Sequence, residues 1–386
     1  MNACKAAFVY SDDFLAYSFH ENHPFNQKRI LLTKKLLENH HALTIDQVIT
    51  PPVAEEEDIL SIHSPEYIHA VKHASKLEPV ANQEIYGIGT TDTPMFQNMY
   101  DAARRIVGGS IEAANLVLTN QVDHALNLAG GLHHGFPTHA SGFCILNDIA
   151  ITIQYIRQHY HLKVLYIDID AHHGDGVQHC FYDDPNVCTV SFHETGRYLY
   201  PGTGKISERG IKKGFGYSFN FPLDAFTEDD SYLHTFNESI DKIASYFQPD
   251  IIVSQHGTDT HYLDPLTHMH TTMKIYETIP KKIHQLAQQY CGGKWVALGG
   301  GGYDIWRVVP RAWAQLWNIM QTNTSFSGAI SSDWIEEWQK ESPVTLPTTW
   351  HDSLENYKAI PRRKEISEFN RQVLEQVLKF VENAKN

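Results

Sequence analysis

The chain has 386 residues, of which 42% are hydrophobic, and a formal net charge of −14 at pH 7. This length can bury a large core, and no apolar run is long enough to cross a membrane. The acidic excess argues against a surface that binds nucleic acid phosphates. The first residues lack the layout of a signal peptide, so we expect a soluble cytoplasmic protein with neither nucleic acid nor a membrane as partner.

The cysteines are five in number and form no Cys-x-x-Cys pair. They are Cys4, Cys144, Cys180, Cys188 and Cys291. This odd, scattered set predicts neither a disulfide framework nor a cysteine zinc site.

Strand-like and helix-like patterns alternate along the chain. The predicted strands begin at Ala6, Ala125, Val164, Val187, Asp250 and Trp295. The predicted helices cover Asn26–Glu38, Tyr67–Ala74, about Phe96–Leu118, a segment running toward Phe247, and about Glu365–Val381. Ser64 before Pro65 is a typical helix cap, and Thr227 with Asp230 predicts a cap for the helix toward Phe247.

This alternation predicts an α/β fold in which helices cover both faces of a parallel sheet. We expect a single domain over residues 1–386. Residues from about 334 to 386 would form a peripheral C-terminal extension that ends in a helix.

The stretch Val164–Asp175 joins a buried strand to a cluster of polar side chains. Asp168, Asp170 and His172 would project to one side if the strand continued that far. A carboxylate directly after a buried strand is costly unless it is compensated. An Asp-x-His pair supplies ligands suited to zinc or another borderline divalent ion, so this stretch predicts a metal site rather than a solvated strand end.

Three further strands end in glycines followed by polar side chains. The segments are Gly130–His134, Gly257–Asp259 and Gly299–Tyr303. In open α/β sheets, ligands bind outside the carboxyl ends of the strands. We therefore expect these segments to meet Asp168–Asp175 in one site.

Eight short motifs follow one another between Tyr10 and Trp313. They are His23–Arg29, Gly130–His134, Ala140–Cys144, Asn147–Asp148, Asp168–Asp175, Pro201–Gly204, Asp259 with Asp264–Pro265, and Gly299–Tyr303. In this set and order the chain resembles the histone deacetylase superfamily, most closely its bacterial acetoin-utilisation branch. The resemblance implies the arginase/deacetylase fold, in which three α/β/α layers surround a central, mostly parallel sheet of about eight strands.

The resemblance also implies a role for each matching residue. The implied metal ligands are Asp170, His172 and Asp259, which would hold Zn²⁺ or, alternatively, Fe²⁺. The implied catalytic residues are His133, His134, Asp168, Asp175 and Tyr303. The implied substrate contacts are Asp92, Gly142, Phe143, Tyr200 and Leu266. A structural K⁺ or Na⁺ ion is implied beside Asp168, Asp170, His172, Ser191 and Phe192.

These roles imply hydrolysis of the acetyl amide of N6-acetyl-lysine in a protein. His134 would take a proton from water and return one to the leaving amine, while His133 acts mainly through its charge. Tyr303 would donate a hydrogen bond to the developing oxyanion. The implied partner is an acetylated metabolic enzyme, with acetyl-CoA synthetase as the leading candidate.

Four residues depart from the family's pattern. Leu132 stands where many eukaryotic members have an aromatic residue, and Tyr200 where the channel is usually closed by phenylalanine. His256 and Thr258 flank Gly257 in a turn where smaller or apolar neighbours are expected. The hydroxyl of Tyr200 would narrow the channel or add a polar contact.

Two other functions stay open. An acetylpolyamine or other small-amide amidohydrolase would use the same metal centre, but it would need an insertion at the channel mouth, and none is evident. An inactive acyl-lysine-binding protein would keep the pocket, yet loss of activity normally removes at least one ligand or catalytic residue. Arginase-like chemistry shares the fold but needs more carboxylates around Asp-x-His.

Overall fold

The computed structural model describes residues 4–353, 355 and 357–383 and contains an eight-stranded sheet. The strand order is β2-β1-β3-β8-β7-β4-β5-β6, and each neighbouring pair is parallel. The strands are β1 (Ala6–Val9), β2 (Val48–Ile49), β3 (His124–Asn127), β4 (Val164–Asp168), β5 (Val187–Glu194), β6 (Ser218–Leu223), β7 (Ile251–Gln255) and β8 (Trp295–Leu298). The predicted parallel sheet is confirmed, and the sequence pattern missed β2 and β6.

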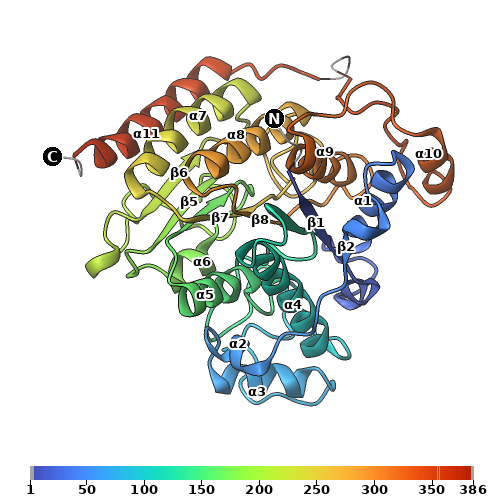
Figure 1. Ribbon diagram of the computed structural model, residues 1–386, viewed down its shortest axis with the longest axis vertical. Helices are drawn as coiled ribbons and strands as arrows, with labels where there is room; N and C mark the ends of the chain where they lie inside the picture. Colours follow the sequence, from blue (N-terminus) through green and yellow to red (C-terminus); the bar gives the residue numbers. More distant parts are fainter. Residues whose placement is uncertain (1–3, 354, 356, 384–386) are drawn as a thin grey trace.

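Helices cover both faces of this sheet (Figure 1). On one face α11, α7, α8, α9 and α1 pack against one another in that order, and α4, α5 and α6 lie on the other. The helices are α1 (Lys28–Asn39), α2 (Glu56–Leu60), α3 (Pro65–Ala74), α4 (Met99–Leu118), α5 (Asp148–Tyr160), α6 (Asp175–Cys180), α7 (Asp229–Phe247), α8 (Met273–Tyr290), α9 (Val309–Thr322), α10 (Ser332–Trp338) and α11 (Arg363–Asn383), with 3₁₀ turns η1 (Asp12–Ala16), η2 (Ile45–Gln47) and η3 (Lys212–Gly214). The result is the predicted three-layer α/β/α arrangement.

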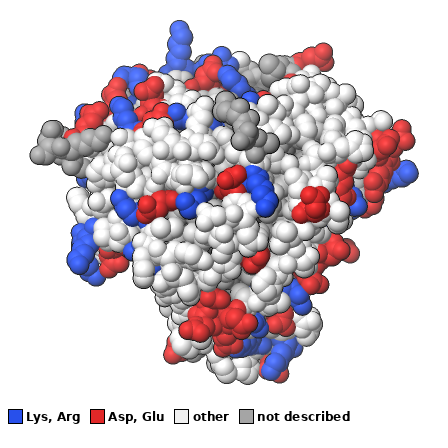
Figure 2. All heavy atoms as spheres, in the orientation of Figure 1, with Lys and Arg blue, Asp and Glu red and all other residues white. Residues whose placement is uncertain are grey.

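Charged side chains of both signs are interspersed over the face shown in Figure 2, and acidic side chains gather over α2 at its lower end. Glu55 is the N-cap residue of α2, and Glu56, Glu57 and Asp58 form its first turn. Carboxylates at a helix N-terminus interact favourably with the helix dipole, so this group stabilises a short helix. None of the helices in the described part of the chain combines the length and apolarity that a membrane span requires.

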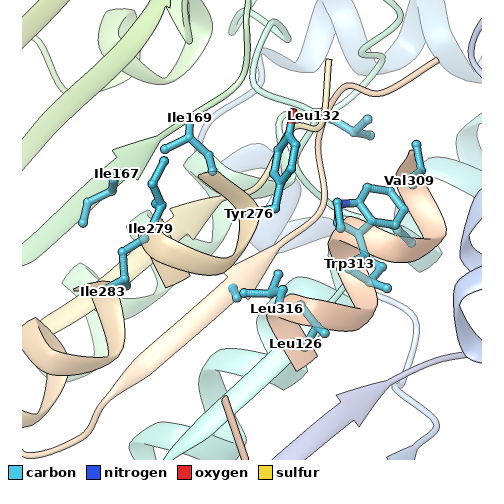
Figure 3. Packing of buried hydrophobic residues seen from close by; sticks show 14 of the residues in the cluster. Leu126, Leu132, Ile167, Ile169, Tyr276, Ile279, Ile283, Val309, Trp313 and Leu316 are labelled. Atoms are coloured by element: carbon cyan, nitrogen blue, oxygen red, sulfur yellow. The ribbon is translucent and has the colours of Figure 1, made fainter. Parts of the chain in front are cut away.

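Strand side chains alternate between the two helix layers. In β4, Leu165 and Ile167 belong to one hydrophobic cluster, whereas Val164 and Tyr166 belong to the other. Figure 3 shows Ile167 beside residues of α8 in the first cluster. A strand buried on both faces reads as a continuous apolar run, which is why the sequence pattern identified β4.

The carboxyl ends of four neighbouring strands lie level in the sheet. Asn127 of β3 pairs with Leu298 of β8, which in turn pairs with Gln255 of β7. Gln255 pairs with Asp168 of β4. Each is the last residue of its strand, so the segments that follow meet at one edge of the sheet.

The predicted helix caps have different outcomes. Ser64 caps α3 as predicted, because its side chain accepts a hydrogen bond from the backbone N–H of Tyr67. The prediction that Thr227 caps α7 is wrong, since the helix begins at Asp229 with Glu228 as its N-cap residue. The Thr227 hydroxyl instead donates to a backbone carbonyl of the preceding turn.

Residues after α9 pack closely onto the preceding elements. Trp334 of α10 is buried, and its indole N–H donates to the backbone carbonyl of Leu32 in α1. Trp350 is also buried and stacks on Phe326. The terminal helix α11 packs against α7 and β6, so it covers the outer edge of the sheet.

Candidate functional site

Three acidic and imidazole side chains converge beyond the ends of β4 and β7. Asp170, His172 and Asp259 each offer a potential ligand atom, and these atoms lie within 4.8 Å of one another. The Nδ1 atom of His172 lies 3.0 Å from a carboxylate oxygen of Asp170 and 3.0 Å from one of Asp259. All three side chains are buried. The structure thus brings the three predicted metal ligands together.

This group fits a divalent metal ion. Burial and the neighbouring carboxylate of Asp170 raise the pKa of Asp259, which shows that two anionic side chains repel each other here. A divalent cation relieves that repulsion, and two carboxylates with one imidazole are donors that zinc or iron accepts. Three protein ligands also leave coordination positions open, as catalytic sites require.

Backbone bends, not strand alternation, position the ligands. The strand β4 ends at Asp168, so the condition under which Asp168, Asp170 and His172 would line one side of a strand is not met. The backbone N–H of Ala171 donates to Asp259 at 2.9 Å and ties the loop after β4 to the loop after β7. Asp168 consequently faces a different partner from the other two.

The second carboxylate oxygen of Asp170 is held by two donors. The side-chain amide of Gln255 lies 2.6 Å away and the backbone N–H of Gly301 lies 2.7 Å away. A Cβ atom at Gly301 would stand only 2.2 Å from a carboxylate oxygen of Asp259. Glycine is therefore required where the loop after β8 closes over the ligands.

Two histidine–carboxylate pairs lie beside the ligand group. His133 Nδ1 lies 2.8 Å from Asp168, and His134 Nδ1 lies 2.7 Å from Asp175. The hydroxyl of Tyr166 also donates to Asp168 at 2.7 Å. A carboxylate behind an imidazole fixes its tautomer and orientation, so each ring presents Nε2 toward the site.

The two histidines differ in their electrostatic surroundings. Burial would lower the pKa of His133, but the carboxylates of Asp168 and Asp170 outweigh it and raise the pKa to about 9. Burial and the neighbouring charge of His133 lower the pKa of His134 to about 4, against the pull of Asp175. At neutral pH, His133 therefore carries a proton that His134 lacks.

Tyr303 lies next to the ligand group. Its ring is perpendicular to that of His172, with centroids 6.4 Å apart. Burial and the nearby carboxylates of Asp259 and Asp170 raise its pKa well above the usual value, so the hydroxyl keeps its proton. The backbone N–H of Tyr303 donates to Asp264 at 2.8 Å, which anchors the residue.

Two aromatic residues lie beside the predicted catalytic side chains. The ring of Phe143 lies 5.9 Å from Tyr303, and the ring of Tyr200 lies 5.1 Å from His134, both edge to face. The hydroxyl of Tyr200 hydrogen-bonds to Ser141, which gives the extra oxygen a partner on the opposite loop. The structure thus places Phe143 beside Tyr303 and Tyr200 beside His134, and their role as channel walls stays a prediction.

Gly142 lies against the imidazole of His134. Its φ is +50°, and a Cβ atom there would stand 2.4 Å from the imidazole of His134. Both its backbone conformation and the space around it require glycine.

The two predicted rim residues are exposed and linked indirectly to the site. The backbone carbonyl of Asp92 lies 3.3 Å from Nε2 of His23, whose ring packs 4.7 Å from that of Phe143. The backbone N–H of Leu266 donates at 2.9 Å to Asp264, the carboxylate that also holds Tyr303.

Leu132 contributes to the core beneath the site. It is 2% exposed, and Figure 3 shows it among Ile169, Tyr276 and Val309. Its backbone N–H donates to Asp148 at 2.8 Å, and this carboxylate also accepts from Gly131. The difference from the family's pattern at Leu132 therefore affects the packing next to His133 and His134.

His256 and Thr258, which depart from the family's pattern, are buried in the turn after β7. Burial lowers the pKa of His256 to about 3, and its Nε2 lies 2.8 Å from the hydroxyl of Ser254. Its backbone carbonyl accepts the indole N–H of Trp313. The backbone carbonyl of Thr258 accepts the hydroxyl of Tyr276 at 2.8 Å. Both residues therefore hold the turn that carries Asp259.

Sequence reasoning gave no role to two residues that position the site. Gln255 holds Asp170, and Asp264 holds the backbone of Tyr303. Gln255 is the last residue of its strand, and a polar residue there was the available signal. Asp264 lies within a matched motif, but its partner is 39 positions away in the chain.

Comparison with known proteins agrees with this geometry. Residues 23–320 match the histone deacetylase domain. The chain is 55% identical over 375 residues to the acetoin utilization protein AcuC of Bacillus subtilis (strain 168), covering 97% of this chain and 96% of that protein. It is 45% identical over 376 residues to AcuC of Staphylococcus xylosus, covering 97% and 98%.

Solved structures give the same result. An HDAC homologue from Aquifex aeolicus matches with a TM-score of 0.83 at 27% identity, covering 95% of this chain and 100% of that chain. An HDAC homologue complexed with SAHA matches with a TM-score of 0.82 at 27% identity, covering 97% and 99%. The resemblance noted in the sequence is confirmed, and the chain belongs to the histone deacetylase family of metal-dependent deacetylases.

Proposed function

We propose that this deacetylase hydrolyses the acetyl amide of N6-acetyl-lysine in proteins. The observation that carries the proposal is the placement of two histidine–carboxylate pairs and a tyrosine around one group of metal ligands. Amide hydrolysis needs a base for water, an acid for the leaving amine and a donor for the oxyanion. Residues of this cluster would fill all three roles.

The residues Asp170, His172 and Asp259 would hold the metal ion, for which we propose Zn²⁺ with Fe²⁺ as the alternative. Such an ion, when bound, polarises the substrate carbonyl and lowers the pKa of a neighbouring water molecule. We also propose a structural K⁺ or Na⁺ ion next to Asp168, with ligands from Ser191 and Phe192.

The protein's own groups would handle the protons. His134, neutral and oriented by Asp175, would accept a proton from the attacking water and deliver one to the amine. His133, charged and oriented by Asp168, would stabilise negative charge. The Tyr303 hydroxyl would donate to the oxyanion, the interaction that strengthens most in the transition state.

The approach to the site suits a lysine side chain. The rings of Phe143 and Tyr200 would contact the apolar stem, and Gly142 would leave room beside it. Asp92 and Leu266 would contact the substrate at the rim, where both are exposed.

The proposed protein substrate is acetylated acetyl-CoA synthetase in the cytoplasm. The support is the name of the similar proteins, which associates them with acetoin utilization. Acetylated synthetase incubated with the enzyme should lose acetyl groups by mass spectrometry. An unchanged acetylation level, with a model peptide hydrolysed in parallel, would refute this substrate and leave the peptide activity intact.

The activity itself is tested with an acetyl-lysine peptide and an acetylpolyamine, each with and without a chelator. Peptide hydrolysis that a chelator abolishes and Zn²⁺ restores is expected. Hydrolysis of the polyamine alone would favour the small-amide amidohydrolase. Failure to hydrolyse either compound, with metal bound, would favour an inactive acyl-lysine-binding protein.

A further inference from the structure

A second cluster of metal-ligating side chains lies at the amino ends of the strands, whereas the deacetylase site lies at their carboxyl ends. It consists of Cys4, which precedes β1, His124, the first residue of β3, and His284 of α8. The cluster lies at the amino end of β3, and the carboxyl end of β3 leads to the catalytic histidines. The two groups share no residue.

The geometry of the cluster suits ligands of one ion. Each of the three residues offers a ligand atom, and these atoms lie within 4.8 Å of one another. Nε2 of His124 and Nδ1 of His284 are 3.1 Å apart. Two imidazole nitrogens bound to one tetrahedral zinc ion are about 3.3 Å apart, given zinc–nitrogen bonds of about 2.0 Å. The separation therefore fits a shared ion as well as a hydrogen bond.

The backbone holds Cys4 in this place. The next residue, Lys5, receives hydrogen bonds at its carbonyl from the backbone N–H groups of Asp123 and His124. The N–H of Lys5 donates in return to the Asp123 carboxylate at 2.9 Å. The side-chain amide of Gln288, one turn beyond His284 in α8, lies 3.6 Å from the Cys4 sulfur. The cysteine is thus fixed against β3 and α8 at once.

Both imidazoles are buried where they face each other. His124 is fully buried, and its Nδ1 has no hydrogen-bond partner among the described residues. One of the two facing nitrogens carries the hydrogen of the bond between the rings, and the other offers its lone pair.

We propose that Cys4, His124 and His284 form a second metal site, which binds a transition metal ion of the zinc class. The Cys4 thiol gives up its proton to solvent as the sulfur–metal bond forms. The imidazole that donates the hydrogen bond moves that hydrogen to its other ring nitrogen, so that both facing nitrogens offer a lone pair to the ion. Three protein ligands leave the fourth tetrahedral position to water. Occupancy would tie the N-terminal segment to β3 and α8, far from the bound substrate.

Cobalt(II) added to metal-free, full-length protein tests the site. A thiolate ligand gives Co²⁺ a near-ultraviolet charge-transfer band, whereas the deacetylase site has only oxygen and nitrogen donors and gives none. The wild type should bind two Co²⁺ ions per chain and show this band. Cys4→Ser should bind one ion and lose the band, while Cys180→Ser, which changes another partly exposed cysteine, should match the wild type.

A second variant separates metal binding from a simple pair of hydrogen-bonded histidines. His284→Gln keeps a polar group on α8, and it should weaken or abolish the band while circular dichroism shows a folded chain. A wild type that shows no thiolate band at saturating Co²⁺, or a band that persists in Cys4→Ser, overturns the proposal. Neither result would affect the acetyl-lysine assay.

Discussion

His133 and His134 are neighbours in the chain with ring centroids 4.0 Å apart, yet their pKa values are shifted in opposite directions. Burial lowers both pKa values, but two carboxylates outweigh burial at His133, whereas the charge of His133 adds to the effect of burial at His134. His133 contacts Asp168 and lies 3.9 Å from Asp170, whereas His134 contacts Asp175 and is exposed to the charge of His133. A charged and a neutral imidazole side by side can divide electrostatic and proton-transfer roles.

The histidine pair yields the first prediction. His134→Asn removes the general base, so kcat on an acetyl-lysine peptide should fall by roughly a hundredfold to ten-thousandfold. In His133→Asn, kcat should fall less, because this change removes charge stabilisation but leaves the general base His134 in place. Metal content should match the wild type in both, and His159→Asn, at an exposed position on α5, serves as the control. A loss of kcat in His133→Asn that equals or exceeds the loss in His134→Asn would contradict the proposed division of roles between the two histidines.

Tyr303→Phe keeps the ring and deletes only the hydroxyl. If that hydroxyl stabilises the oxyanion, kcat should fall by roughly a hundredfold or more while KM changes little. Tyr290→Phe, at the far end of α8, should leave both constants unchanged. Steady-state kinetics on one peptide measure the effect, and unchanged turnover in Tyr303→Phe would remove this residue from the mechanism.

Gly142→Ala tests whether the close approach of Gly142 to His134 positions the imidazole. The added methyl group would collide with the imidazole, so turnover should fall sharply. Gly328→Ala is the matched control, because Gly328 also has a positive φ, +79°, but has nothing within 4 Å of the new atom. The positive φ should lower the thermal stability of both variants by a similar amount, and only Gly142→Ala should lose activity. Similar activity in the two variants would mean that His134 tolerates displacement.

The sequence predicted the site because its signals are local. Polar residues directly follow each strand in the sequence, as in Asp168–Asp175. Because the strands are parallel, their carboxyl ends lie at the same side of the sheet, and these residues meet there. The exact placement was not predictable in this way. Asp170 and His172 lie in a bend after β4, and the hydrogen bond from Ala171 to Asp259, 88 positions away, determines where they point.

Long-range contacts also explain what the patterns missed. Asp264 could not be recognised as the anchor of Tyr303 without knowing that the two loops meet. The same holds for Cys4, which has no metal-ligand spacing in the sequence but lies beside two histidines in the structure. The strand β6 carries Pro222 and follows a segment that contains Gly210, Gly214 and Gly216, features that weaken a strand pattern, although its other residues are buried.

The final prediction concerns the segment before α11. The side chain of Asp352 is 4% exposed, and its carboxylate binds Arg311 at 2.8 Å, His261 at 3.1 Å and the backbone N–H of Met273 at 2.8 Å. Burial opposes the charge, but the hydrogen bond from His261 and the charge of Arg311 outweigh it and hold the pKa of Asp352 well below its usual range.

Asp352→Asn should therefore lower the free energy of unfolding at pH 7 by about 3 kcal/mol, because it leaves the buried guanidinium of Arg311 without its counter-charge. A carboxylate whose pKa is depressed on folding stabilises the protein above its unfolded pKa of about 3.8, and that contribution fades as pH falls toward the folded value. The difference between wild type and variant should accordingly be constant above about pH 5 and shrink below about pH 4. Urea unfolding of wild type, Asp352→Asn and the exposed-site control Asp46→Asn across this range measures it, and a difference that does not change with pH would show that packing, not charge, makes Asp352 important.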